Sequence, residues 1–282
     1  MSAVKTQTYF RPETYRTLCI VGILAFGGLL MIIPYYWMFI TSIKPLAEIH
    51  TFPPRFYVQH PTVAPYGDLF KLLPMARAFF NSIFVALTVT VSNVFFCSLA
   101  GYAFAKLRFP GRDAIFFLFV ASMMIPWQVN IIPCFVIIRH LGWLNSYQAL
   151  IVPNLARAFG IFLCRQYVLS IPKDFMEAAR IDGCSEFGIY WRVILPLMTP
   201  ALAALAIFIF LDQWNSFVWP LVIIHSGHMR TIPLIMTVLT GQFAANFAMV
   251  MAGSVVATLP IIVMFLAFQR QFIKGVMLTG IR

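Results

Sequence analysis

The sequence is poor in charged residues. Only 10% of its 282 residues are Asp, Glu, Lys or Arg, whereas a soluble globular domain has about 25%. Acidic residues are the scarcer kind, 9 against 20 basic ones, so the formal net charge is +11. Hydrophobic residues make up 61% of the chain, and the mean hydropathy is +0.86. This composition excludes an ordinary soluble enzyme and indicates a membrane protein.

Sequence motifs of catalysis are missing as well. The chain has no Gly-Lys dipeptide and therefore no phosphate-binding P-loop, and it has neither a His-Glu-x-x-His nor a Gly-x-Ser-x-Gly motif. Its five cysteines are scattered, odd in number and without a Cys-x-x-Cys pair. We interpret them as small core residues and predict no disulfide, metal site or cofactor. The sequence therefore does not predict an enzyme.

Long hydrophobic runs are present instead. A bilayer core about 30 Å thick needs about 20 apolar residues per helix. Six runs meet this length, at roughly 18–40, 79–104, 114–138, 148–169, 199–222 and 248–269. The first is too long for the hydrophobic region of a signal peptide, so we expect a retained span. Pro and Gly interrupt several runs, which favours a packed bundle around a pathway. The expected fold is an all-α membrane protein with six transmembrane helices.

The basic residues predict the orientation of these spans. With the N-terminus in the cytoplasm, 13 of the 20 Lys and Arg residues fall in inner segments and 6 in outer ones. Basic residues favour the cytoplasmic side, so both termini and the loop at 165–198 are expected there. The same charges suit anionic membrane lipid. They are dispersed over separate loops, which argues against a nucleic-acid partner. Without repeats or low-complexity tracts, the chain is expected to form one membrane domain, residues 1–282.

A polar segment near residues 170–198 interrupts the apolar pattern. Local rules predict a helix starting at Pro172, a left-handed cap at Gly183 and a second helix capped by Ser185. In this second helix, apolar residues recur at helical spacing: Phe187, Tyr190, Trp191 and Ile194. Pro196 then ends it. From these residues alone, a hairpin that merely packs on the bilayer and a docking element are equally plausible.

This segment resembles a known family. Glu177-Ala178-Ala179, then Gly183, then Leu195-Pro196 are similar to the motif of membrane subunits (permeases) of bacterial ABC importers, although Val193 stands where that family usually has Ile. The resemblance implies a coupling element, between the fourth and fifth helices, that docks on a separate ATPase. The coupling residues it implies are Glu177, Ala178, Ala179, Asp182, Gly183, Phe187, Tyr190, Leu195 and Pro196.

Two further stretches narrow the resemblance. Residues 212–221, which contain Trp-Asn and Trp-Pro-Leu, and the tail at 268–280 look like those of carbohydrate-type importers, such as the maltose and glycerol-3-phosphate systems. The resemblance implies a permease domain with a core at about 79–272 and a coupling loop at 170–198. It also implies a second, homologous permease, two ATPase subunits, an extracytoplasmic solute-binding protein and a place in the bacterial inner membrane. Solute would cross by alternating access driven by ATP hydrolysis on the partner.

Polar residues inside the expected spans are candidates for solute contact, because the bilayer makes them costly. The candidate substrate-binding residues are Asn93, Gln128, Asn130, Asn154, Arg157, Asp212, Trp214 and Asn215. Each has a structural alternative, since Asn can bridge helices and Trp can lie in an interfacial belt.

Arg157 and Asp212 lie at similar expected depths, about 13 and 15 Å from the outer ends of their spans. An ion pair that neutralises both charges is the favoured interpretation. The alternative is that Arg157 faces the pathway and binds an acidic oligosaccharide or a sugar phosphate. Two other functions remain open: a permease for a non-sugar solute, and an ion-coupled secondary transporter.

Overall fold

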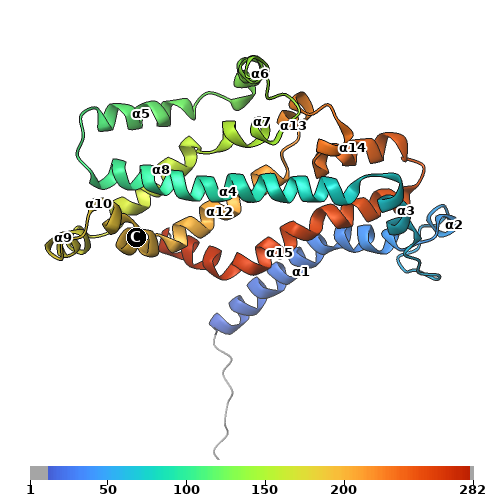
Figure 1. Ribbon diagram of the computed structural model, residues 1–282. Coiled ribbons are helices and arrows are strands. Elements are labelled where there is room, and N and C mark those ends of the chain that lie inside the picture. The colour runs from blue at the N-terminus through green and yellow to red at the C-terminus, as the bar shows by residue number, and fades with distance from the viewer. Residues whose placement is uncertain (1–11, 280–282) are drawn as a thin grey trace, which may run out of the picture. The chain divides into compact units, whose positions relative to one another are not determined.

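The computed structural model describes residues 12–279, and the side chains of residues 16–269. Every regular element in this part of the chain is a helix, as expected (Figure 1). The elements are α1 (Pro12–Ser42), α2 (Leu46–Ile49), α3 (Ala64–Leu72), α4 (Met75–Lys106), α5 (Arg112–Ser122), η1 (Trp127–Asn130), α6 (Ile131–His140), α7 (Tyr147–Ile151), η2 (Val152–Asn154), α8 (Ala158–Ser170), α9 (Asp174–Ile181), α10 (Glu186–Ile189), η3 (Tyr190–Ile194), α11 (Leu195–Leu197), α12 (Thr199–Trp214), α13 (Val218–Ile223), η4 (Gly227–Met229), α14 (Ile232–Gln242) and α15 (Phe247–Thr279).

The chain divides into two compact units. The first comprises residues 1–69 and 243–255, and the second comprises residues 70–242 and 256–282. In the first unit, the loop after α2 is fastened by Glu48, whose carboxylate accepts hydrogen bonds from the backbone N–H groups of Gln59 and His60 at 2.9–3.2 Å. The second unit holds every candidate site residue.

Helix α4 is the long central helix of the second unit. It packs along α8 and α12, and Figure 1 shows α5 running beside it. Gly101 makes the approach to α8 possible, because a Cβ there would lie 2.5 Å from Cys164 Cβ and 2.8 Å from the backbone N of Arg165. Such close backbone contacts between membrane helices are typical of small residues.

Among the described residues, four helical segments are long and apolar enough to cross a membrane: Arg16–Ser42, Met75–Lys106, Tyr147–Ser170 and Phe247–Gln269. They contain four of the six expected runs. Two bent pairs of helices raise the number to six if each pair forms one span: Arg112–Ser122 with Trp127–His140, bent by 94°, and Glu186–Leu197 with Thr199–Trp214, bent by 78°.

The two remaining expected runs differ from the structure. The run at 114–138 is not a straight helix, because the chain turns between Ser122 and Trp127, where Pro126 lacks a backbone donor. The expected run at 199–222 is not a single helix either, because α12 ends at Trp214 and a new helix, α13, starts at Val218. The expected position of the two termini concerns residues 1–11 and 280–282, which lie outside the described residues. Most side chains of the tail motif at 268–280 lie outside them too.

Candidate functional site

Residues 174–194 form a helical hairpin, as local rules predict. Helix α9 ends in a tight turn in which Gly183 has φ +78°. The N–H of Gly183 donates to the carbonyl of Arg180, and the N–H of Cys184 donates to that of Ala179, both at 3.0 Å. This pair of bonds is the Schellman motif, which favours glycine at the left-handed position. The left-handed cap at Gly183 is thus confirmed, while α9 begins at Asp174 rather than at Pro172.

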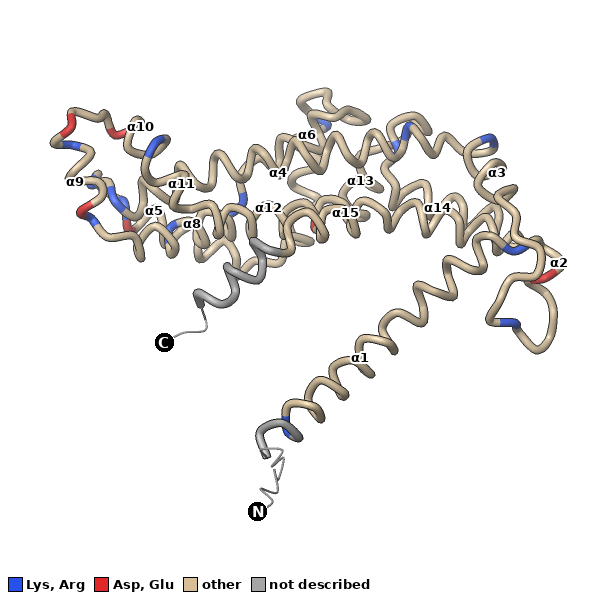
Figure 2. The backbone as a smooth tube through the Cα atoms, turned by 90° about the horizontal axis from the view of Figure 1, so that it is seen from below, with Lys and Arg blue, Asp and Glu red and all other residues tan. Residues whose placement is uncertain are grey.

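The second helix of the hairpin begins at its expected cap. The Ser185 hydroxyl accepts a hydrogen bond from the N–H of Gly188 at 3.2 Å. The helix then widens into a π-helical turn at Tyr190–Ile194. Such turns are rare in proteins, and those that occur often lie at functional sites. Figure 2 shows many charged residues of the second unit near α9, α10 and the neighbouring parts of α5 and α8, whereas the middle of the unit carries few.

The hairpin exposes several apolar side chains. Ile181 is 86% exposed at the turn, and Phe175, Phe187 and Trp191 are each at least half exposed. The rings of Phe187 and Trp191 stack with their centroids 6.3 Å apart. Large apolar side chains that are exposed together on a polar loop are typical of a surface that a partner covers.

Not all expected coupling residues reach this surface. Glu177, Ala178, Asp182 and Pro196 are exposed, while Ala179 is buried and Leu195 is partly buried. Tyr190, which with Phe187 was expected to fill the apolar part of an ATPase socket, is fully buried in its own chain. Its hydroxyl lies 2.8 Å from Ser98 Oγ of α4. Trp191, and not Tyr190, thus lies exposed beside Phe187, and the coupling role of Tyr190 stays a prediction.

Charged contacts hold the two legs of the hairpin together. Arg180 Nε donates to Glu186 Oε1 at 2.8 Å, and the Tyr102 hydroxyl of α4 donates to Glu186 Oε2 at 2.7 Å. These donors, Arg180 first, hold the pKa of the Glu186 carboxyl below its usual range. Glu186 is therefore ionised at neutral pH and joins α9, α10 and α4.

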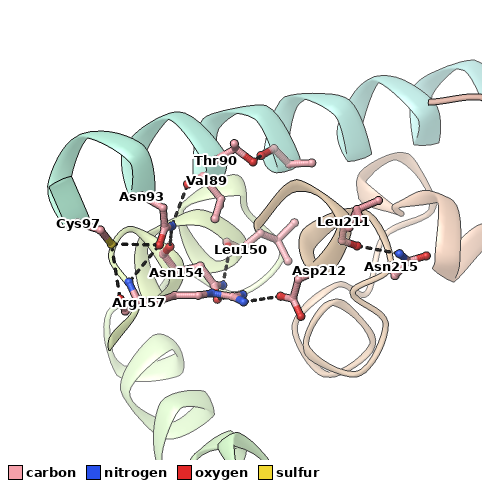
Figure 3. A network of polar contacts seen from close by, with 11 residues as sticks. Val89, Thr90, Asn93, Cys97, Leu150, Asn154, Arg157, Leu211, Asp212 and Asn215 are labelled. Atoms are coloured by element: carbon pink, nitrogen blue, oxygen red, sulfur yellow. Dashed lines mark hydrogen bonds and ion pairs between the residues drawn. The ribbon is translucent and has the colours of Figure 1, made fainter. Parts of the chain in front are cut away.

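A second polar cluster surrounds the break between η2 and α8 (Figure 3). Arg157, the N-cap of α8, has an extended backbone. Its N–H donates to Asn93 Oδ1 of α4 at 3.0 Å, and Asn93 Nδ2 donates to the carbonyl of Asn154 at 2.7 Å. The Asn93 side chain thus satisfies backbone groups that the broken helix leaves without helical partners, as buried polar groups require.

Arg157 and Asp212 form the expected ion pair. One guanidinium nitrogen, Nη1, contacts Asp212 Oδ2 of α12, and Nη2 donates to Asn154 Oδ1 at 3.0 Å. The side chains are 30% and 57% exposed, respectively. Figure 3 shows the guanidinium lying between Asn154 and Asp212. The pair has no net charge, and it links the start of α8 to α12.

The other candidates for solute contact fall into two groups. Asn93 and Trp214 are buried and bonded within the chain, Trp214 through its Nε1, which donates to the carbonyl of Ala257 at 3.0 Å. Both side chains are thus bonded within the chain, which favours structural roles, and their contact with solute stays a prediction. Gln128, Asn130 and Asn215 are exposed, together with Asp212, and Asn154 is partly exposed. Gln128 and Asn130 lie on η1, a different element from those of the Arg157 cluster.

The sequence analysis missed Ser98, Tyr102 and Glu186. Ser98 contacts Tyr190, which lies 92 residues away in sequence, and Tyr102 contacts Glu186, which lies 84 residues away. The 98–102–106 spacing of polar side chains at the end of an apolar helix was the available signal, because residues four apart share a helix face.

Comparisons with known proteins identify the family. Residues 95–277 match the model of the family described as "Binding-protein-dependent transport system inner membrane component". The chain belongs to this family. The matched residues include the whole hairpin and, of the second polar cluster, Asn154, Arg157 and Asp212. The resemblance predicted from sequence motifs is confirmed.

Two curated relatives of this permease are named for carbohydrates. The chain is 36% identical to an arabinooligosaccharides transport system permease protein of Bacillus subtilis, over 90% of the chain and 92% of the relative. It is 30% identical to a lactose transport system permease protein of Rhizobium radiobacter, over 91% and 93%. The fold also resembles a chain in the crystal structure of a bacterial ABC transporter that imports the acidic polysaccharide alginate, with a TM-score of 0.81, 26% identity, and coverage of 95% of this chain and 100% of that one.

Members of this family are permeases, and ABC transporter permeases are not catalytic subunits. The hairpin presents an outward surface, and the Arg157 cluster lies within the helices.

Proposed function

We propose that this chain is a permease subunit of a bacterial ABC importer for carbohydrates. It works with a homologous second permease, two ATPase subunits and an extracytoplasmic solute-binding protein, and it spans the inner membrane with both termini in the cytoplasm. Its two units act as one transmembrane domain, residues 1–282, with six spans, a core at about 79–272 and a coupling loop at 170–198. ATP hydrolysis takes place on the partner and drives alternating access.

The observation that carries this proposal is the hairpin. It matches the coupling motif of the family at Glu177, Gly183 and Pro196, and it exposes Ile181 at 86%. An apolar side chain at such exposure is stabilised when a partner covers it. Carboxylates beside it, such as Glu177 and Asp182, are suited to charge-assisted hydrogen bonds with the ATPase.

Co-purification tests this docking role. The tagged chain, extracted in mild detergent from cells that produce the whole importer, is expected to carry a second permease and two ATPase subunits. Glu177→Lys or Ile181→Asp is expected to release the ATPase while the second permease stays bound. Asp68→Lys is the matched control, because it reverses the charge of an exposed residue on α3. An ATPase that stays bound equally to all variants would contradict the docking role.

The names of the relatives support a carbohydrate solute. Identification by mass spectrometry of the solute that the cognate binding protein carries, followed by its ATP-dependent uptake in proteoliposomes, tests this part. A non-sugar solute would favour the alternative of a permease for another solute class. Uptake without the ATPase, driven by an ion gradient, would favour a secondary transporter.

The exposed polar residues Gln128, Asn130, Asp212 and Asn215, with Asn154 and Arg157, are the proposed solute contacts. The Arg157–Asp212 pair is neutral as a whole, and this supports a structural link rather than a preference for acidic carbohydrates. Uptake of matched neutral and acidic sugars by Arg157→Ala distinguishes the two roles. An equal loss of both fits the structural link, while a selective loss of the acidic sugar would assign Arg157 to solute recognition.

A further inference from the structure

The inner end of α4 carries a polar stripe made of Ser98, Tyr102 and Lys106. The residues are four apart and therefore lie on one face of the helix. Each contacts a different part of the 171–190 segment. The Ser98 and Tyr190 hydroxyls lie 2.8 Å apart, the Tyr102 hydroxyl donates to Glu186, and Lys106 Nζ donates to the carbonyl of Ile171 at 2.6 Å. Two successive turns of α4 thus hold the hairpin itself, and a third holds Ile171 in the chain that leads into it.

The middle contact of the stripe connects the most elements. Glu186 lies in the first turn of α10, and Arg180, its other partner, lies in the last turn of α9. One carboxylate therefore holds both legs of the hairpin to the Tyr102 hydroxyl. The Tyr102 side chain is buried, and its ring lies 5.8 Å from that of Tyr190. A hydrogen bond from a buried donor to an ionised acceptor is among the stronger ones in proteins.

The same helix reaches the second polar cluster. Asn93 precedes Tyr102 by nine residues, or about 14 Å along the helix axis. Asn93 holds the helix break at Asn154 and Arg157, and Arg157 in turn contacts Asp212 of α12. Helix α4 is continuous between these points, with no Pro within it. A displacement of the hairpin that is carried through Tyr102 therefore reaches the Arg157 cluster through one rigid element.

We propose that Tyr102 is a positioning residue for coupling: its hydrogen bond to Glu186 transmits the movement of the docked hairpin to α4, and so to the break at Arg157. The inference rests on the proposed function, because it requires a partner that moves the hairpin. Without the hydroxyl, the hairpin can follow the ATPase while α4 follows only in part. ATP is then hydrolysed without a matching number of transport events.

The experiment uses the complete importer in proteoliposomes with its binding protein and solute. Solute uptake and ATP hydrolysis are measured on the same preparation for the wild type, Tyr102→Phe and Tyr167→Phe. Tyr167, a partly buried tyrosine of α8, is the control, since it loses the same atom outside the stripe. Tyr102→Phe is expected to keep most of its ATP hydrolysis and to lower the uptake per ATP about fivefold, a ratio that corresponds to about 1 kcal/mol. The control is expected to keep the wild-type ratio.

A purely structural role gives a different result. If Tyr102→Phe only loosens the fold, uptake and hydrolysis fall together and their ratio is unchanged, and this outcome would overturn the inference. Glu186→Ala provides a second variant at an exposed position and is expected to lower the ratio in the same way, whether or not Tyr102→Phe assembles. A wild-type complex without ATP-dependent uptake would instead overturn the proposed function, and this inference with it.

Discussion

Replacing Asn93 by Leu tests whether this residue is structural. The Asn93 side chain is fully buried, and its two long-range bonds involve backbone groups, the carbonyl of Asn154 and the N–H of Arg157. Leucine removes both bonds and leaves the two backbone groups next to an apolar side chain. Its third bond, to the carbonyl of Val89 on the same helix, matters less, because that carbonyl can accept the helical N–H at position 93.

The size of the effect follows from these contacts. A buried polar group that loses its partner costs about 1–3 kcal/mol. Two such groups cost about 2–6 kcal/mol, and the greater apolar burial of leucine offsets about 1–2 kcal/mol of this. Polar contacts between membrane helices can contribute as little as about 0.6 kcal/mol each, which sets a lower bound near 1 kcal/mol. We expect a loss of about 1–5 kcal/mol in the free energy of unfolding.

The chain carries its own reporter for this measurement. Cys97 and Cys164 are buried thiols, and Cys97 Sγ lies 3.6 Å from Asn93 Oδ1. A thiol-reactive fluorescent dye reports their exposure during heating in detergent. At about 2–4 °C per kcal/mol, the midpoint for Asn93→Leu is expected to fall by roughly 2–20 °C.

Asn130→Leu is the matched control, because Asn130 is exposed, and its midpoint is expected to stay near that of the wild type. Equal midpoints for wild type, Asn93→Leu and Asn130→Leu would refute the reasoning that Asn93 satisfies the broken helix.

Three further substitutions have expected outcomes of their own. Gly183→Ala places a Cβ at φ +78° and is expected to weaken ATPase binding in pull-down assays by the equivalent of about 1 kcal/mol. Gly183→Asn is expected to weaken it less, because Asn tolerates the left-handed conformation better. If the Ala and Asn variants bound the ATPase equally well, this would count against the strained turn. Arg157→Asp and Asp212→Arg are each expected to lower the thermal stability by about 1–3 kcal/mol, because the pair is half exposed. The double variant, in which the two charges are exchanged, is expected to recover part of this loss. If the losses of the two single variants simply added in the double variant, the pair would make no direct contribution. Gly101→Ala is expected to lower the unfolding midpoint, because the new Cβ lies 2.5 Å from Cys164 Cβ and overpacking costs about 1–3 kcal/mol, whereas Gly241→Ala, with nothing within 4 Å, is not.

Local patterns predicted the hairpin well. Gly183 and Ser185 act through bonds to neighbours within five residues, so their roles can be inferred from a short stretch of sequence. Four of the hydrophobic runs coincide with candidate spans for the same reason, because length and apolarity decide whether a helix can cross a bilayer.

Sequence could not predict which face of a span is buried. Apolar residues occur on every face of α4, so periodicity does not distinguish the face that packs on α8 from a face that remains open. Asn93 was therefore assigned to solute contact together with residues that are exposed. Tyr102 was not selected at all, because its partner Glu186 lies 84 residues further along the chain, and only the packed fold brings the two together.

The Asn93 and Tyr102 variants test each other, because both residues lie on α4 but have different proposed roles. Asn93→Leu is expected to lower both the thermal stability and the uptake per ATP, because Asn93 is the contact between α4 and the break at Arg157. Tyr102→Phe is expected to lower the uptake per ATP alone, since it removes one hydroxyl and keeps the packed ring. If both variants lowered stability and left the ratio unchanged, α4 would be a scaffold for the hairpin and the break. If only Tyr102→Phe changed the ratio, the same helix would contain separate contacts for holding the fold and for transmitting movement.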